Sequence, residues 1–317
     1  MNLHQWLIKI CFVAFILSIS SISSSKTFDM LYEVTVRIDP EIQSSESEYI
    51  TDAVNILLLR LTGREDAALM LSSEIANNID NYILQRGFIS TNEYYLFFIE
   101  NQVRSFLKEN GLFYWPKDRP VVGIIAFNAA VFNEGITNVL FRETENRGIF
   151  YEPIDASDYS LTFEDYLFGN TGKFLSVLKD SHYNYMVLIN LTDTPFGPQL
   201  SWDIIDPTQG QSTFMSQSLH DGFVIISDYL ASKYSVIDNE LSIDIVIQQI
   251  DSAEDFIKAR DYLTALNIVN RVLLNQIQQD KFYFTVDLIG GLEAFEGVIA
   301  LDQIIYSDGN SGFVLEN

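Results

Sequence analysis

Two aspartates, Asp155 and Asp158, are the side chains in this sequence that are best placed to do chemistry. They follow a predicted buried strand over residues 149–154, and ligand sites in α/β sheets gather beyond the carboxyl ends of strands. A pair of carboxylates there could bind a small ligand or act as general acid and base. Aspartate is also a preferred helix N-cap, so capping is the competing interpretation of both residues.

Histidine offers little further chemistry. His182 and His220 are the histidines that follow residue 25, and their spacing is not that of a metal-ligand pair. Surface or capping roles are therefore favoured over a first-row metal site. Serines and aspartates are abundant, but no Gly-x-Ser-x-Gly elbow supports a serine nucleophile. We predict no catalytic residue and no metal.

Two glycine-containing segments resemble ligand loops. Residues 169–173 read Gly-Asn-Thr-Gly-Lys, but Leu167 holds the outer glycine position of a phosphate loop and Phe174 follows the lysine. Residues 308–312 resemble the start of a calcium loop, yet no glutamate is available for its twelfth position. We predict a turn at the first segment and a hairpin turn at the second, and we expect no cofactor.

The first twenty-five residues predict an export signal. Residues 1–9 carry one lysine and no acid, residues 10–19 form an apolar block, and Ser23 and Ser25 fit the small-x-small rule for cleavage before Lys26. About ten apolar residues are fewer than the roughly eighteen that span a bilayer, so cleavage is favoured over an uncleaved inner-membrane anchor. We expect a periplasmic protein that touches the membrane only if the signal stays attached.

The amino-acid composition argues against cysteine-dependent sites and against binding of nucleic acid. Removal of the signal would also remove Cys11, the single cysteine, so the mature chain could form no disulfide, thiolate site or iron–sulfur cluster. Its 48% hydrophobic content allows a large core instead. Lys and Arg total 19 against 43 Asp and Glu, a formal net charge of −24. Such a charge repels phosphate backbones and anionic lipid, so nucleic acid is not an expected partner.

Hydrophobic periodicity locates the secondary structure. Helices are predicted over 44–61, 65–75, 101–108, 132–147, 220–233, 253–266 and 292–300. Strands are predicted over 28–38, 81–89, 94–99, 121–127, 149–154, 185–191, 199–205, 241–250, 268–276 and 282–289, with one or two edge strands after residue 300.

These elements group into three small helix-on-sheet modules behind the signal of residues 1–25, an α+β and α/β architecture. The first module spans 26–115 with the order β-α-α-β-β-α. The middle module, 118–236, is α/β, and the last, 240–317, has the ferredoxin-like order β-α-β-β-α-β.

The connector between the first two modules is short and stiff. It follows Trp115 and contains Arg119 and Pro120, and proline restricts both its own backbone and that of the preceding residue. We predict that Trp115, Arg119 and Pro120 form a packed hinge between the first and middle modules.

Several short motifs together resemble a known bacterial family. They are Leu31-Tyr32-Glu33-Val34-Thr35-Val36, Arg60-Leu61-Thr62-Gly63, Gly111-Leu112-Phe113-Tyr114-Trp115 with Arg119-Pro120, the acidic element 153–158, Trp202, and Ala253-Glu254-Asp255-Phe256 through Tyr262-Leu263. The chain is identified by them as a member of the bacterial domain-of-unknown-function family two-thousand-and-sixty-six, exported proteins mainly of gammaproteobacteria. The middle module departs from it in its many aromatic and asparagine residues. The resemblance implies an envelope location and an α/β architecture, and it implies no activity.

The sequence is consistent with two functions. The first is a non-enzymatic exported module that binds another envelope protein or assists assembly, with exposed strand edges or an apolar patch between modules as its contact surface. The alternative is a carboxylate-dependent exported hydrolase or small-ligand-binding protein that uses Asp155 and Asp158.

Overall fold

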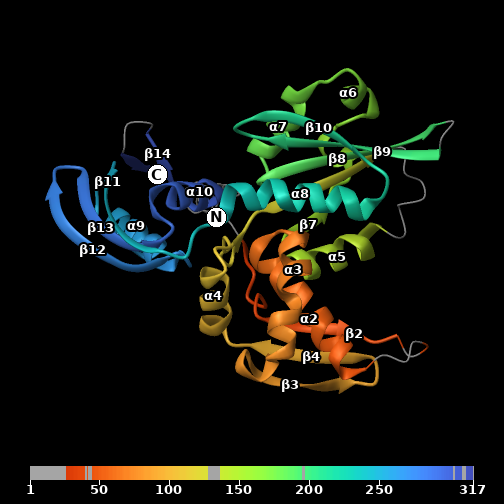
Figure 1. Ribbon diagram of the computed structural model, residues 1–317. Coiled ribbons are helices and arrows are strands. Elements are labelled where there is room, and N and C mark those ends of the chain that lie inside the picture. Colours follow the sequence, from red (N-terminus) through yellow and green to blue (C-terminus); the bar gives the residue numbers. More distant parts are fainter. Residues whose placement is uncertain are drawn as a thin grey trace, which may run out of the picture.

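The structure is a computed structural model that describes residues 26–39, 41, 45–127, 136–194, 197–302, 304–308 and 312–316. It confirms the mixed α+β fold class, with helices packed on separate sheets (Figure 1). The predicted signal segment lies outside the described residues. Among the residues described, no helix is both long and apolar enough to cross a membrane.

The first module has the predicted order of elements. It contains β2 (Glu33–Arg37), α2 (Glu46–Thr62), α3 (Glu65–Asn77), the short 3-10 helix η1 (Ile79–Asn81), β3 (Ile83–Ser90), β4 (Glu93–Phe98) and α4 (Glu100–Glu109). The strands pair antiparallel in the order β2-β4-β3. The first strand is shorter than predicted, because residues 29–32 form a turn before it.

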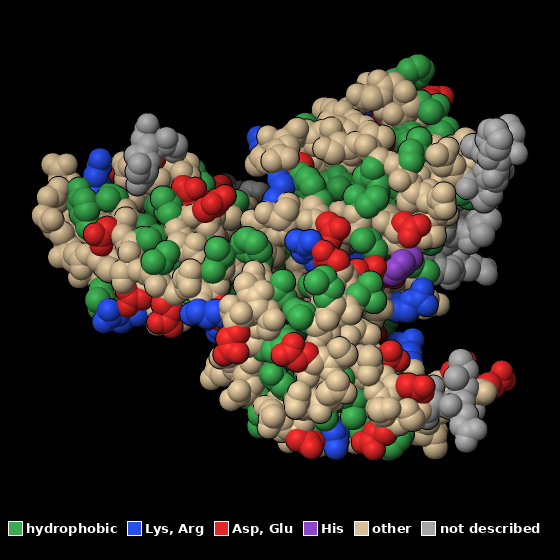
Figure 2. Space-filling model, in the orientation of Figure 1, with side chains coloured by type: hydrophobic (Ala, Val, Ile, Leu, Met, Phe, Trp, Pro, Cys, Tyr) green, Lys and Arg blue, Asp and Glu red, His purple; other side chains and the backbone are tan. Residues whose placement is uncertain are grey.

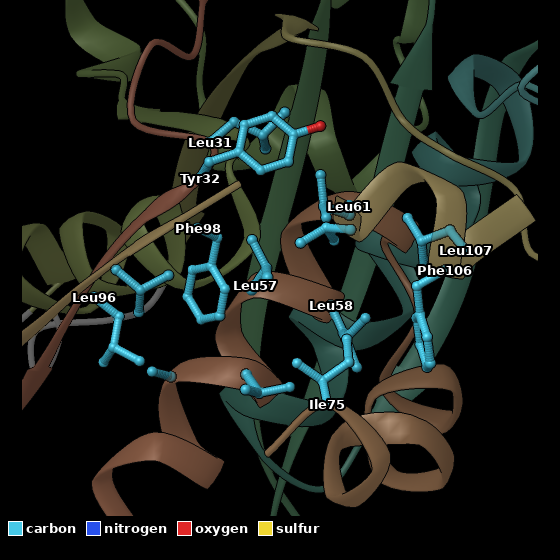
Figure 3. Close-up of a cluster of buried hydrophobic side chains, with 14 of the residues drawn as sticks. Leu31, Tyr32, Leu57, Leu58, Leu61, Ile75, Leu96, Phe98, Phe106 and Leu107 are labelled. Carbon is cyan, nitrogen blue, oxygen red and sulfur yellow. The ribbon is translucent and has the colours of Figure 1, made fainter. Parts of the chain in front are cut away.

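The core of this module follows from the helical spacing of apolar residues along α2. Leucines of α2 face the inner side of the sheet and the flanking helices, where each buried leucine contributes about 1.5–3 kcal/mol. Figure 3 shows part of the set that fills this core: Leu57, Leu58, Leu61, Leu96, Phe98 and Phe106. The helix begins after Ser45, whose backbone N–H donates to the Glu48 carboxylate at 2.7 Å, a capping interaction.

The middle module is a five-stranded mixed sheet with helices on both faces. Its strands are β6 (Val121–Phe127), β7 (Phe150–Pro153), β8 (Tyr185–Thr194), β9 (Gly197–Asp206) and β10 (Gly210–Ser216). The order is β10-β9-β8-β6-β7, with β6 parallel to β7 and β8. The helices are α5 (Ile136–Arg147), η2 (Ala156–Tyr159), α6 (Phe163–Leu167), α7 (Thr171–Lys179) and α8 (Leu219–Tyr234).

Three elements of the middle module differ from the prediction. The strand β10 and the helices α6 and α7 were not predicted, and α7 begins inside the segment 169–173 that was predicted as a turn. Glycine at position 172 weakens the helical signal there. The helix forms because Phe174, Val177 and Leu178 pack on the sheet, so tertiary contact decides its conformation.

The C-terminal module also has the predicted order of elements. It contains β11 (Glu240–Gln248), α9 (Ala253–Ala265), β12 (Val269–Gln278), β13 (Lys281–Ile289), α10 (Gly291–Asp302), β14 (Ile305–Ser307) and β15 (Phe313–Leu315). The sheet order is β12-β13-β11-β15-β14. In a ferredoxin-like sheet the strand after the second helix pairs with the first strand. Here β14 lies at the edge and β15 pairs with β11 in parallel instead.

The modules share contacts at their junction. The short strand β1 (Lys26–Thr27) pairs with β5 (Asp118–Arg119) in the connector, and Tyr114 pairs with Val236 in an isolated bridge. Val236 also belongs to the core cluster of the first module. The connector is therefore enclosed by the surrounding modules.

Candidate functional site

The structure places Asp155 and Asp158 on the surface after β7. Asp155 caps η2: its Oδ1 accepts hydrogen bonds from the backbone N–H of Ser157 at 2.9 Å and from the Ser157 hydroxyl at 2.7 Å. These bonds lower the pKa of Asp155. Asp158 lies in η2, and both side chains are exposed. Asp155 is therefore the N-cap of η2, and Asp158 is an acidic residue in the first turn of that helix.

The hinge residues lie in the interior. The Trp115 ring is fully buried, its plane is within 15° of the Tyr234 ring, and the Arg119 guanidinium lies 4.1 Å from its centroid. Arg119 donates from Nη2 to the carbonyls of Arg60 and Trp115, at 2.7 and 3.0 Å. Burial lowers the pKa of Arg119 to about 9. Pro120 is buried beside it. These residues pack the junction and leave little room for a ligand.

A pocket of about 670 Å³ lies between the first module and the middle module. One wall is the turn between α2 and α3 with the start of α3, and another is α8; α3 and α8 lie side by side in Figure 1. Figure 2 shows basic and acidic side chains interleaved, with one histidine, along this boundary. The residues that line the pocket are Thr62, Arg64, Glu65, Asp66, Phe113, Val224, Asp228, Ala231, Ser232 and Ser235.

The turn that forms one wall is held tightly against α8. Gly63 has φ +69°, and a Cβ at this position would lie 2.4 Å from the Cβ of Ala231. The hydroxyl of Ser227 donates to the Gly63 carbonyl at 2.9 Å. Only glycine allows this left-handed turn to approach the helix so closely. The motif Arg60-Leu61-Thr62-Gly63 therefore positions the pocket.

Arg60, near the end of α2, also holds this turn in place. Its guanidinium donates to the backbone carbonyls of Glu145, Met30 and Glu33, at 2.6, 2.8 and 2.6 Å. Burial lowers the pKa of Arg60 to about 10. Three carbonyl acceptors satisfy most of the donors of this buried cation. The arginine thus links α2 to β2, to the turn before β2 and to α5.

Ion pairs occupy most of the charged groups at the wall formed by the α2–α3 turn. Arg64 binds Asp66 through two hydrogen bonds of 3.0 and 2.5 Å. Glu65 accepts from Arg147 Nη2 at 2.9 Å and lies 3.2 Å from His220 Nε2. Glu65 and Asp66 therefore each form an ion pair with an arginine, Arg147 and Arg64 respectively.

The wall formed by α8 carries polar groups without partners. Within the described part of the chain, the exposed Asp228 makes no hydrogen bond or ion pair; partial loss of hydration raises its pKa, and the charges of Arg64 and Arg147 oppose that rise. The Ser235 hydroxyl is buried and finds no hydrogen-bond partner among the same residues. Val224, Ala231 and Phe113 add apolar side chains to the lining of the pocket. A buried hydroxyl without a partner is costly, and the Ser235 hydroxyl is a group with which a ligand in the pocket can form a hydrogen bond.

The two candidate histidines are not brought together. His220 approaches Glu65 at the pocket, whereas His182 Nε2 lies 2.8 Å from Glu152 on β7. The described ranges contain no group of three or more His, Cys, Asp or Glu residues that could hold a metal ion. Sequence reasoning missed Asp228 and Ser235. Asp228 lies within the predicted helix 220–233 and Ser235 two residues beyond its end, and no sequence pattern distinguished either residue.

Comparisons with known proteins add little to this geometry. No protein-family model matches the chain, and no curated protein matches it. Among solved structures, the C-terminal domain of LpoB from Salmonella enterica, in selenomethionine form, is similar over 31% of this chain and 83% of its own, with 12% identity and a TM-score of 0.23. A TM-score this low supports no structural equivalence. The resemblance to the domain-of-unknown-function family stays a prediction from sequence.

Proposed function

We propose that this chain is a non-enzymatic exported module that binds another protein of the bacterial envelope, and that the pocket between its first and middle modules is the recognition site. The observation that supports the proposal is the pocket itself, whose lining combines apolar side chains with Asp228 and the unpartnered hydroxyl of Ser235. Pockets that combine apolar lining with a few polar groups are the usual binding sites of proteins. The expected export signal supports the envelope location.

The surroundings of the pocket favour a protein partner. Leu69 and Met70 follow the pocket-lining Glu65 and Asp66 by one turn of α3, and they are 78% and 75% exposed. Phe113, in the pocket wall, is 51% exposed. Exposed apolar side chains gathered at a pocket mark an interaction surface, since isolated small-ligand sites bury their apolar lining.

Site-specific photocross-linking in cells tests this function. A cross-linking amino acid at Phe113 or Met70 should capture one envelope protein, identified by mass spectrometry. The same amino acid at Phe168, which is 78% exposed after α6 on another part of the middle module, should capture none. Equal capture at all three positions, or at none, would contradict the proposal.

A second experiment uses a variant in which a large side chain fills the pocket. Ser232 lines the pocket from an exposed position on α8, so Ser232→Trp should fill it and abolish cross-linking at Phe113. Ser176→Trp places the same side chain on an exposed position of α7 and should leave the adduct intact. Asp155→Ala and Asp158→Ala should also leave it intact. Loss of the adduct in the aspartate variants would favour the small-ligand alternative.

A further inference from the structure

We propose that the group bound in the pocket is a basic side chain of the partner protein, a lysine or arginine whose cationic end meets Asp228 and whose stem lies on the apolar surface beside it. This inference rests on the proposed function, and it names the chemistry that the same site selects.

Of the three carboxylates that line the pocket, one forms no ion pair among the described residues. Arg64 is bidentate to Asp66, and Arg147 binds Glu65. Among the described residues, Asp228 alone of the three pocket-lining carboxylates makes no hydrogen bond or ion pair, although the charges of Arg64 and Arg147 act to lower its pKa. A ligand cation would therefore meet an exposed carboxylate that no side chain already binds, and hydrogen bonds between charged groups are stronger than those between neutral groups.

An anionic ligand does not fit the same site. Arg64 lines the pocket, but both of its bonded nitrogens already serve Asp66. The amino end of α3, which could attract an anion, carries Glu65 and Asp66 in its first turn. Those carboxylates occupy the positive end of the helix dipole and would repel a phosphate or carboxylate.

The remaining lining matches the rest of a basic side chain. Val224, Ala231 and Phe113 form an apolar surface, and lysine and arginine place their methylene stems on such surfaces while the charged head stays in a polar site. Asp228 on α8 and Ser235, the C-cap of the same helix, are seven residues apart, about 10 Å along the helix axis. A peptide group at the base of the stem would lie near the unpartnered Ser235 hydroxyl, which a free amine would leave unpaired.

Binding of short probes to the purified protein, measured by titration calorimetry, tests the inference. The probes are acetyl-Gly-Lys-Gly-amide, its norleucine counterpart, which keeps the stem and removes the ammonium, and butylamine, which keeps the ammonium and removes the peptide. We expect the lysine peptide to bind, and the norleucine peptide to bind at least about tenfold more weakly, because one charge-assisted hydrogen bond is lost. Equal binding of the norleucine peptide would overturn the cationic occupant. Butylamine binding as tightly as the lysine peptide would overturn the protein side chain as its source.

A matched pair of variants locates the cation. Asp228→Asn keeps the shape of the side chain and should weaken binding of the lysine peptide by about ten- to a hundredfold. Asp221→Asn removes the same charge from the first turn of the same helix, at an exposed position outside the pocket lining, and should leave the affinity unchanged. Thermal unfolding of both variants verifies the fold. Equal losses in the two variants would overturn the assignment, since overall charge alone would then explain them.

The two proposals fail in different ways. If Phe113 and Met70 still cross-link a protein but the lysine peptide does not bind, the cationic occupant is wrong and the protein-binding function stands. If the lysine peptide binds while neither position cross-links a protein in cells, the protein-binding function is wrong, and the inference that the cation belongs to a partner protein is overturned with it.

Discussion

At Asp206, five donor groups from four residues hold a buried carboxylate in its charged form. Burial alone would raise the pKa of Asp206, but hydrogen bonds from Lys233, Tyr229 and Thr208 outweigh it and hold the pKa well below its usual range. The backbone N–H of Gln209 donates as well, at 3.1 Å. The carboxylate thus anchors the turn between β9 and β10 to the last turns of α8. Its contribution to stability should depend on pH.

The variant Asp206→Asn should lower the free energy of unfolding at pH 7 by about 1.5–3 kcal/mol, the value of hydrogen bonds to a charged group. Because the folded pKa is depressed, the stability from this carboxylate is full above about pH 4, its unfolded value, and is lost as the pH falls toward the folded pKa. Denaturant unfolding from pH 7 to pH 3 should therefore show the wild type and the variant converging in acid. The exposed Asp180→Asn is the control, and a pH-independent difference at Asp206 would contradict the argument.

Trp115 is the largest side chain that is completely buried at the junction. The variant Trp115→Ala should destabilise the protein by about 3–5 kcal/mol, because a cavity replaces the ring between Tyr234 and Arg119. Denaturant unfolding at neutral pH measures this loss. Phe168→Ala removes an aromatic ring from an exposed position and should change the midpoint little. A melting curve unchanged by Trp115→Ala would show that the ring is not packed as described.

At the scale of elements, the α2–α3 turn depends on a glycine for two separable reasons. Gly63 and Gly111 share a left-handed backbone, with φ of +69° and +66°, but a Cβ at Gly63 would meet Ala231 while one at Gly111 would meet nothing within 4 Å. Gly111→Ala should therefore cost only the backbone term of about 1–2 kcal/mol. Gly63→Ala should cost about 1–3 kcal/mol more through overpacking against α8. Equal unfolding free energies for the two variants would show that the turn is free to move away from the helix.

Hydrophobic periodicity was sufficient to predict the helices and strands whose conformation is determined by their own residues. Strand β6 begins and ends where the continuous apolar run 121–127 predicted, and α2 follows its apolar stripe to within two residues at each end. The polar strand β10 and the helix α7 depend on what they pack against, so no local pattern marked them. The parallel pairing of β15 with β11 joins residues about 65 positions apart and had no local signal either.

The candidate site was harder to predict than the elements that carry it. Its walls come from the turn at residues 64–66 and from α8 more than 150 residues later, so only the packing of two modules brings them together. Asp155 and Asp158 stood out because they follow a strand, a purely local criterion. Asp228 differs from Glu65 and Asp66 in making no ion pair, and this can be recognised only when the positions of Arg64 and Arg147 are known.

At the scale of the whole molecule, the position of β1 bears on signal removal. Lys26 and Thr27 pair with Arg119 and Asp118, and the Lys26 ammonium binds Glu152. Cleavage before Lys26 would leave this first strand complete. We expect intact-mass measurement of protein recovered from the periplasmic fraction to give a chain that starts at Lys26, because the apolar block is too short for a stable span. Recovery of a chain with Met1 from membranes would support the anchored alternative.

The connector should also make the molecule unfold as one unit. Arg119 donates to the carbonyl of Arg60 in the first module, and Asp118 accepts from the backbone and side-chain amides of Asn267 in the last, at 3.1 and 2.6 Å. Core residues are shared as well: Val236 and Ile289 belong to the cluster of the first module. Cooperative unfolding follows when each module loses buried contacts as its neighbour opens.

The variant Arg119→Ala tests this coupling. It removes two hydrogen bonds from a buried charged donor, worth about 1.5–3 kcal/mol each, and leaves the Arg60 and Trp115 carbonyls without that donor. Scanning calorimetry should show one transition for the wild type and a lower, broadened or divided transition for the variant. Arg86→Ala removes an arginine whose ion pairs with Glu46 and Asp80 lie at the surface, and it should cost less than about 1 kcal/mol without changing the shape of the transition. A single sharp transition in Arg119→Ala, shifted no further than in Arg86→Ala, would mean that the modules are coupled through their shared apolar core and not through the connector.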